Sequence, residues 1–218
     1  MARRTQGTSA GLTHERIAAA AVALVDRDGL ERFGVRRLAD ELGVDPMSIY
    51  NHIKGKAALL DAVGEAVLAE MPTGADDEPT TWEEIARRTA HNYREIAYRH
   101  PHVVPLLATR PQTSPAALTA LERLVTAMRA AGLPDHIIAD TPLALFGFLN
   151  GYLLAVLSGG SDSPATVPAF DPARYPTMAT LAPRMADFGS ITEFDRLLET
   201  VLAGIRGRVG CSPAPRQP

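Results

Sequence analysis

Residues 33–56, FGVRRLADELGVDPMSIYNHIKGK, constrain the fold of this chain more than any other stretch. Leu38, Ala39 and Leu42 recur at helical spacing, so they predict a short helix over residues 35–42 with one apolar face. A helix of this length is not stable alone, because its stability comes from packing that apolar face. The stretch therefore requires partner helices nearby.

Three residues encode a tight turn after this helix. Gly43 tolerates the left-handed conformation that commonly ends a helix. Asp45 is a good N-cap, because its carboxylate accepts a hydrogen bond from a backbone N–H group that a helix leaves unpaired, and Pro46 suits the first helical position. A second helix therefore begins near Pro46, with Ile49 and Ile53 on its inner face. Helix, short turn with glycine, and helix is the arrangement of a DNA-binding helix-turn-helix.

The second helix carries side chains that can hold or read DNA. Hydroxyl, amide and imidazole groups can bond to base edges or phosphates, and a methionine can contact a thymine methyl group. Lys54 and Lys56, the only lysines of the chain, follow where a phosphate backbone would pass. The predicted DNA-binding residues are Arg36, Arg37, Met47, Ser48, Tyr50, Asn51, His52, Lys54 and Lys56. The alternative is an ordinary helical hairpin with a solvated polar face.

The same segment resembles the N-terminal domain of the TetR family of bacterial transcriptional repressors. The matching residues are Leu38-Ala39, Leu42-Gly43-Val44, Ile49-Tyr50, His52, Lys54 and Lys56, followed by Leu59-Leu60. A weaker resemblance, around Thr109-Arg110-Pro111, is to the ligand domain of the tetracycline-repressor branch. The resemblance implies an all-α fold, with a three-helix DNA-binding domain and a larger helical domain. It also implies a homodimeric repressor that a small-molecule effector releases from a palindromic operator.

The expected domains follow from helical spacing, from N-caps at Thr13 and Thr81, from a helix start at Ser114-Pro115 and from a helix stop at Gly29. Residues 1–56 form the helix-turn-helix domain, with 1–12 as a flexible arm, and residues 57–210 form the effector-binding and dimerisation domain, entered by a connector helix over 57–71. Residues 211–218 form a disordered tail. Further helices are predicted over residues 14–28, 82–99, 115–131, 134–157, 177–188 and 192–208, with loops at 72–80 and 158–176.

Charge and cysteine content narrow the class of protein. The net charge is −3, but residues 1–60 carry nine Lys and Arg against seven Asp and Glu, or +2. A mildly basic N-terminal part on an acidic body favours local rather than global attraction to DNA. The single cysteine, Cys211, and the absence of an apolar signal segment predict a cytoplasmic protein.

The predicted helix over 134–157 contains a charge-free segment, residues 141–157. We interpret it as too short and too interrupted for a membrane span, which needs about 20 apolar residues. An all-round apolar helix in a soluble protein is buried on every side, so one side needs a partner. Together with the last helix, 192–208, it predicts a two-fold four-helix interface between two copies of this chain.

The resemblance implies a helix-lined, mostly apolar effector pocket in the body. The candidate effector-binding residues are Thr89, Tyr93, Leu106, Thr109, Arg110, Met128, Phe146 and Asn150. Tetracycline repressors bind a magnesium-chelated drug through a histidine three residues before Thr-Arg-Pro, and here that position is Leu106. The resemblance therefore implies an effector other than tetracycline–magnesium, and we expect no metal or other cofactor.

Two other functions remain as alternatives. A transcriptional activator would have the same fold. A metal-dependent helical enzyme belongs to a different class, and its candidate ligands are His91, Glu95, His100 and His102. These residues match no metalloprotease, phosphate-loop or nucleophile motif, so we expect no enzymatic activity.

Overall fold

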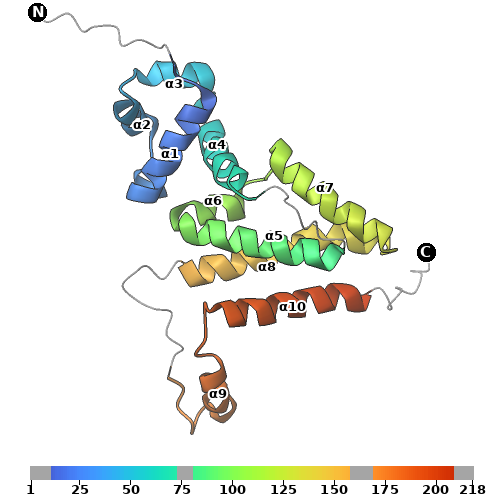
Figure 1. Ribbon diagram of the computed structural model, residues 1–218. Coiled ribbons are helices and arrows are strands. Elements are labelled where there is room, and N and C mark those ends of the chain that lie inside the picture. The colour runs from blue at the N-terminus through green and yellow to red at the C-terminus, as the bar shows by residue number, and fades with distance from the viewer. Residues whose placement is uncertain (1–10, 73–80, 158–168, 209–218) are drawn as a thin grey trace, which may run out of the picture. The chain divides into compact units, whose positions relative to one another are not determined.

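The computed structural model describes residues 11–72, 81–157 and 169–208, and within these ranges all regular structure is helical (Figure 1). The all-α fold is thereby confirmed. The chain divides into two compact units, Met1–Glu78 with Asn92–Ala120, and Pro79–His91 with Leu121–Pro218. The first unit holds the predicted helix-turn-helix. The boundary at residues 56 and 57 between DNA-binding and effector-binding parts stays a prediction.

Helix α1, His14–Asp28, begins and ends where its local signals predict. Thr13 caps it, because its hydroxyl oxygen accepts a hydrogen bond from the backbone N–H of Arg16 at 3.2 Å. Gly29, with φ of 78°, ends it. Leu12, included in the predicted arm, is buried and belongs to the folded part. The buried face of α1 consists of Ile17, Ala18, Ala21, Val22, Leu24 and Val25, whereas Ala20 is half-buried.

The two helices of the predicted motif are α2, Val35–Leu42, and α3, Pro46–His52. Gly43 is left-handed, with φ of 66° and ψ of 31°. The carboxylate of Asp45 accepts a hydrogen bond from the backbone N–H of Met47 at 2.8 Å. The turn and both of its capping residues are therefore as predicted.

The connector is α4, Gly55–Ala69, which packs against α1 and against the segment formed by η2, Pro101–Val103, and α6, Val104–Thr109. Its buried residues are Leu59, Ala62, Val63, Gly64, Val67 and Leu68. Helices α1, α2 and α3 are called the head below. Because α4 packs against α1 and against η2 and α6, it joins the head to the segment formed by η2 and α6 in the same unit.

Helices α5, Trp82–Arg99, and α7, Pro115–Ala130, also carry their predicted caps. Thr81 and Glu84 form a reciprocal box: the N–H of Glu84 donates to Thr81 Oγ1 at 3.3 Å, and the N–H of Thr81 donates to Glu84 Oε2 at 3.1 Å. Ser114 Oγ accepts from the N–H of Ala117 at 3.2 Å. These caps fix where each helix starts.

The second unit is built on α8, Asp135–Leu157, and α10, Ile191–Gly207, which pack together. The ring of Phe194 is fully buried and lies 5.5 Å from that of Tyr152 and 6.0 Å from that of Phe148, between centroids. The hydroxyl of Tyr152 donates to Glu193 at 3.1 Å, and Glu193 also accepts from the N–H of Gly189 at 2.8 Å. The start of α10 is thereby fixed against α8.

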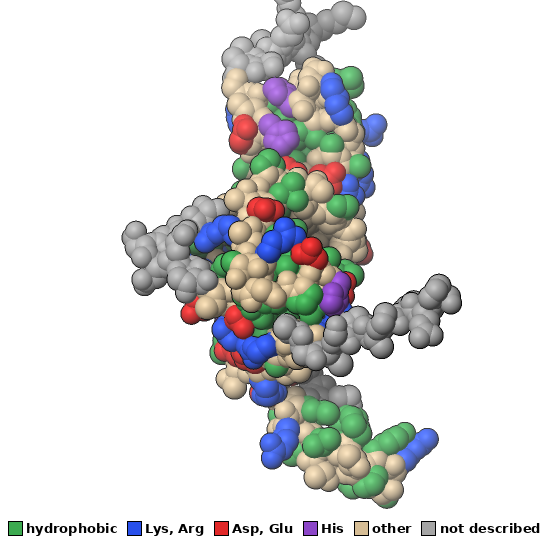
Figure 2. All heavy atoms as spheres, turned by 90° about the vertical axis from the view of Figure 1, so that its right-hand side faces the viewer, with side chains coloured by type: hydrophobic (Ala, Val, Ile, Leu, Met, Phe, Trp, Pro, Cys, Tyr) green, Lys and Arg blue, Asp and Glu red, His purple; other side chains and the backbone are tan. Residues whose placement is uncertain are grey.

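The prediction of one helix over 177–188 is wrong in extent. Helix α9 covers Pro176–Leu181, and a 3-10 turn, η3, covers Ala182–Arg184. Pro183 explains the break, because it has no N–H group to continue the helical hydrogen bonds. Tyr175, Met178 and Leu181 expose apolar side chains. Figure 2 shows hydrophobic side chains, in green, gathered at the lowest part of the view.

The length argument against a membrane span is also wrong. Helix α8 has 23 residues and is apolar enough to cross a membrane by length and composition alone. Its buried residues lie on one face, while Leu143 on another is 80% exposed. Among the described residues, α8 is therefore covered on one face only.

Several predicted segments lie outside the described residues. They are the arm up to residue 10, residues 73–80 of one loop, residues 158–168 of the other, and residues 209–218 at the end of the chain.

The cap of α3 gives a test of how its start is fixed. Replacing Asp45→Ala removes the acceptor for the N–H of Met47, so we expect the free energy of unfolding to fall by about 1 kcal/mol. Asp45→Asn is the matched control, because an amide oxygen caps about as well. Urea denaturation measures both variants. An unchanged midpoint for Asp45→Ala would show that the cap contributes nothing.

Candidate nucleic-acid interface and effector site

Helix α3 has one buried face and one exposed face. Ile49 and Ile53 are 0% and 3% exposed, so they anchor the helix to the head. Met47 is 64% exposed, and Asn51 is exposed on the same side one turn later. An exposed thioether and amide on a helix anchored from behind can reach into a DNA groove.

The remaining polar residues of this helix border that exposed face. His52 is exposed, whereas Ser48 and Tyr50 are half-buried. Ser48 and Tyr50 are therefore less accessible to DNA than the sequence suggested, although both belong to a helix at the surface. Whether these residues contact DNA stays a prediction.

The basic residues after α3 lie at the start of α4. Lys54 and Lys56 are exposed, and Lys54 is the N-cap residue of α4. No side chain of the described residues caps this helix, and its first turn holds no acidic residue. The unpaired N–H groups of a helix start attract phosphate oxygens, and two lysines strengthen that attraction. Arg36, at the start of α2, is also exposed.

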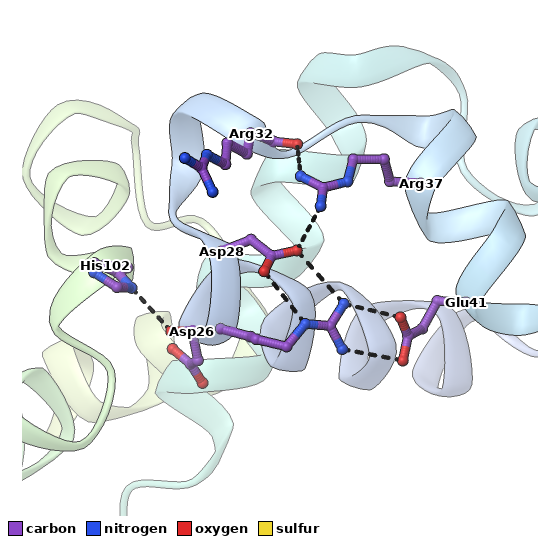
Figure 3. A network of polar contacts seen from close by, with 7 residues as sticks. Asp26, Asp28, Arg32, Arg37, Glu41 and His102 are labelled. Carbon is purple, nitrogen blue, oxygen red and sulfur yellow. Dashed lines mark hydrogen bonds and ion pairs between the residues drawn. The ribbon is translucent and has the colours of Figure 1, made fainter.

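Arg37 has a structural role that the sequence did not reveal. Its guanidinium pairs with Asp28 of α1 at 3.0 Å and donates to the carbonyl oxygen of Arg32 at 3.2 Å (Figure 3). In the same network Arg27 donates to Glu41 at 2.9 Å, and this hydrogen bond holds the pKa of Glu41 below its usual range. Arg37 therefore ties α2 to α1, and a phosphate contact would compete with that pairing.

The effector candidates are divided between the two units. Tyr93, Leu106, Thr109 and Arg110 lie in the first unit. Tyr93 and Leu106 are buried, and burial raises the pKa of the Tyr93 hydroxyl. Thr109 is exposed, and its hydroxyl donates to the carbonyl oxygen of Pro105 at 2.6 Å, so its side chain is occupied by its own helix.

Arg110 joins the connector helix to the segment after α6. Its Nε donates to Asp61 of α4 at 2.5 Å, and its Nη2 donates to the carbonyl oxygen of Ala57 at 3.1 Å. Asp61 was missed in the sequence, because nothing local to α4 shows which distant arginine it meets. The pair makes the segment around Arg110 a direct contact of the connector.

A cavity of about 350 Å³ lies beside this ion pair, entirely within the first unit. Its lining residues are Leu60, Asp61, Gly64, Glu65, Leu106, Arg110, Pro111, Gln112 and Thr113. Of the eight effector candidates, Leu106 and Arg110 belong to this lining. Three apolar side chains, an arginine and an amide can hold a small organic molecule.

The other four candidates, Thr89, Met128, Phe146 and Asn150, lie in the second unit. Met128 is fully buried and the other three are half-buried. A cavity of about 780 Å³ lies between α7 and α8 in this unit, and none of these four residues lines it. Its lining residues are Glu122, Val125, Thr126, Arg129, Ala130, Asp135, Ile138, Ala139 and Pro142.

The histidine and glutamate pattern that suggested a metal-dependent enzyme is not gathered at one point. His91 Nε2 lies 3.2 Å from Asp195 of α10, and Glu95 pairs with Arg99. His100 lies between Asp26 and Glu70. Within the described residues, no three side chains of metal-binding type form a cluster.

Comparison with known proteins identifies both parts of the chain. Residues 17–63 match the family model for bacterial regulatory proteins of the tetR family, and residues 75–209 match the tetracyclin repressor-like C-terminal domain. The HTH-type transcriptional repressor DrrR1 of Streptomyces coeruleorubidus is 32% identical over 83% of this chain and 72% of its own length. An HTH-type transcriptional regulator of Saccharopolyspora erythraea is 32% identical over 91% of this chain and 86% of its own.

Solved structures agree with these matches. Apo ActR from Streptomyces coelicolor has a TM-score of 0.79 at 26% identity, covering 92% of this chain and 98% of ActR. ActR in complex with actinorhodin has a TM-score of 0.78 at 26% identity, covering 90% and 96%. The chain therefore belongs to the TetR family of helix-turn-helix transcriptional regulators.

Proposed function

We propose that this chain is a homodimeric repressor that acts in the cytoplasm and reads a palindromic operator with α3. The observation that carries the proposal is the exposed pair Met47 and Asn51, on a helix whose opposite face is anchored by Ile49 and Ile53. Two such helices, related by a two-fold axis, fit successive major grooves about 34–36 Å apart. Without effector the dimer occupies its operator.

The residues of this surface divide into two roles. Asn51, Met47 and Ser48 read base edges, with Asn51 suited to a bidentate contact with adenine. Arg36, Tyr50, His52 and Lys54 hold phosphates, together with Lys56 and the uncapped start of α4. Arg37 contributes by fixing α2 on α1 through Asp28.

Dimerisation through α8 and α10 is supported by the apolar side of α8 that one copy leaves uncovered. Leu143 is 80% exposed, and Gly147, Gly151 and Ala155 follow at intervals of four residues, all exposed. Residues four apart share one helix face, and small residues allow close approach of a second helix. A second copy of the same face would bury this stripe and bring two heads to one palindrome.

Release by effector is supported by the cavity beside α4. A molecule bound against Leu106 and Arg110 would disturb the pair of Arg110 with Asp61, and therefore the position of the connector. ActR is bound to actinorhodin or (S)-DNPA in solved structures, so an organic molecule of that kind is the first effector class to test here. Coupling of about 1–3 kcal/mol would weaken operator binding roughly 5–150-fold. Leu106 offers no oxygen or nitrogen ligand at the position where tetracycline repressors have a histidine, so we expect an effector other than tetracycline–magnesium.

The roles of the α3 and α4 residues can be separated on a duplex selected from a random library. Asn51→Ala should lose about 1–3 kcal/mol of discrimination at one base position, because a bidentate contact disappears. Lys56→Ala should weaken binding to all sequences and lower the slope of affinity against salt by about 1. Titration at several salt concentrations measures both effects.

Arg129→Ala is the control for loss of a surface cation, because Arg129 lies on α7 and pairs with Asp135. It should bind like the wild type. If Asn51→Ala and Lys56→Ala also bind every sequence like the wild type, α3 and the start of α4 are not the DNA-binding surface.

The dimer interface has its own matched pair of variants. Leu143→Arg places a charge in the uncovered stripe of α8, so we expect the dimer to dissociate to monomers. Leu118→Arg on α7 is the control, because Leu118 is also exposed, at 49%, but lies away from α8 and α10 in the sequence. Sedimentation velocity at micromolar concentration measures the molecular mass. A monomeric wild type, or a dimeric Leu143→Arg variant, would contradict the proposed interface.

A further inference from the structure

A buried histidine connects three helical segments of the first unit. His100 follows α5 and is 7% exposed. Its Nδ1 lies 2.7 Å from Asp26 Oδ2, near the end of α1, and its Nε2 lies 3.2 Å from Glu70 Oε2, at the C-cap of α4. The side chain of His100 therefore joins the end of α1 to the C-terminal end of the connector α4.

The surroundings of His100 are charged and partly dehydrated. Arg99 of α5 pairs with Glu70 at 2.8 Å. Burial would raise the pKa of Glu70, but the hydrogen bonds from Arg99 and His100 outweigh burial and leave the pKa below its usual range. Asp26 Oδ1 is buried and accepts no hydrogen bond from a described residue, so the carboxylate of Asp26 depends on His100. His102 of η2 lies 3.0 Å from the carbonyl oxygen of Asp26 (Figure 3).

The number of protons on the imidazole decides how many of these bonds can form. Carboxylate oxygens only accept hydrogen bonds, so each ring nitrogen must carry a hydrogen to bond its partner. The imidazolium ring bonds both Asp26 and Glu70. The neutral ring has one hydrogen, so it bonds one carboxylate and turns a lone pair toward the other. The bridge from α1 to α4 is therefore complete only in the protonated form.

We propose that His100 is a positioning residue whose protonated ring clamps the end of α1 to the end of α4, and that loss of this proton loosens the head on its connector. The proposal rests on the proposed function, because it assumes that operator binding requires the head to be held in this arrangement. It adds a dependence on the protonation state of His100 to the release by effector.

The direction in which operator affinity changes with pH follows from the hydrogen bonds of His100. The clamp stabilises the arrangement at low pH, where both nitrogens carry hydrogens, and part of that stabilisation is lost as the pH rises. Loss of one charged hydrogen bond corresponds to a weakening of about tenfold. Operator affinity should therefore fall about tenfold as the pH rises and His100 loses this proton.

The test measures operator affinity as a function of pH in a His52→Asn background, which removes the histidine expected at the DNA. His100→Asn keeps one amide donor for Asp26 and does not titrate, so its affinity should stay flat and equal that of the parent at high pH. Glu70→Gln should also stay flat but bind tightly, because an amide can donate to the unprotonated ring nitrogen. His136→Asn, at an exposed histidine of α8, should keep the full pH dependence of the parent.

Hydrogen exchange of the amides at the end of α1 provides a second measurement that needs no DNA. Protection should decrease with rising pH in the parent beyond the intrinsic change in exchange rate, and should not do so in Glu70→Gln. If the parent and both clamp variants show the same pH dependence, the clamp is overturned. If the parent binds no duplex selectively at any pH, the proposed function fails, and the exchange measurement still decides the clamp.

Discussion

The burial of Ile49 and Ile53 against the head fixes the direction of α3, and the DNA-binding surface depends on that direction. Both side chains are almost completely removed from solvent, which is worth about 1.5–3 kcal/mol each. Because residues of a helix project in fixed directions, burying these two turns Met47 and Asn51 outward. The left-handed Gly43 and the Asp45 cap then determine where α3 begins relative to α2.

The connector α4 carries three features along one helix. Its start holds Lys54 and Lys56, its middle pairs Asp61 with Arg110, and its end places Glu70 beside His100. A rigid helix transmits a displacement at one point to its whole length. The proposed effector cavity and the proposed histidine clamp therefore act on the DNA-reading end through the same element, one at its middle and the other at its far end.

Local signals in the sequence were sufficient for most helix boundaries. Thr13, Asp45 and Thr81 act as caps where the sequence predicts them, because capping depends on residues within one turn. The break at Pro183 was missed, although proline is itself a local signal. The pairs of Arg37 with Asp28 and of Arg110 with Asp61 could not be predicted, because they join residues that only tertiary packing brings together. The eight effector candidates are divided between the two units, and which of them contact an effector stays a prediction.

In the proposed complex, two copies of α3 read one two-fold symmetric sequence. Selection from a random duplex library at physiological salt, followed by sequencing of the retained DNA, tests it most directly. We expect an enriched palindrome whose half-sites are centred about 10–10.5 base pairs, or a multiple of that distance, apart. Absence of any enriched sequence, with binding that merely fades as salt rises, would contradict it and leave only non-specific attraction to phosphate.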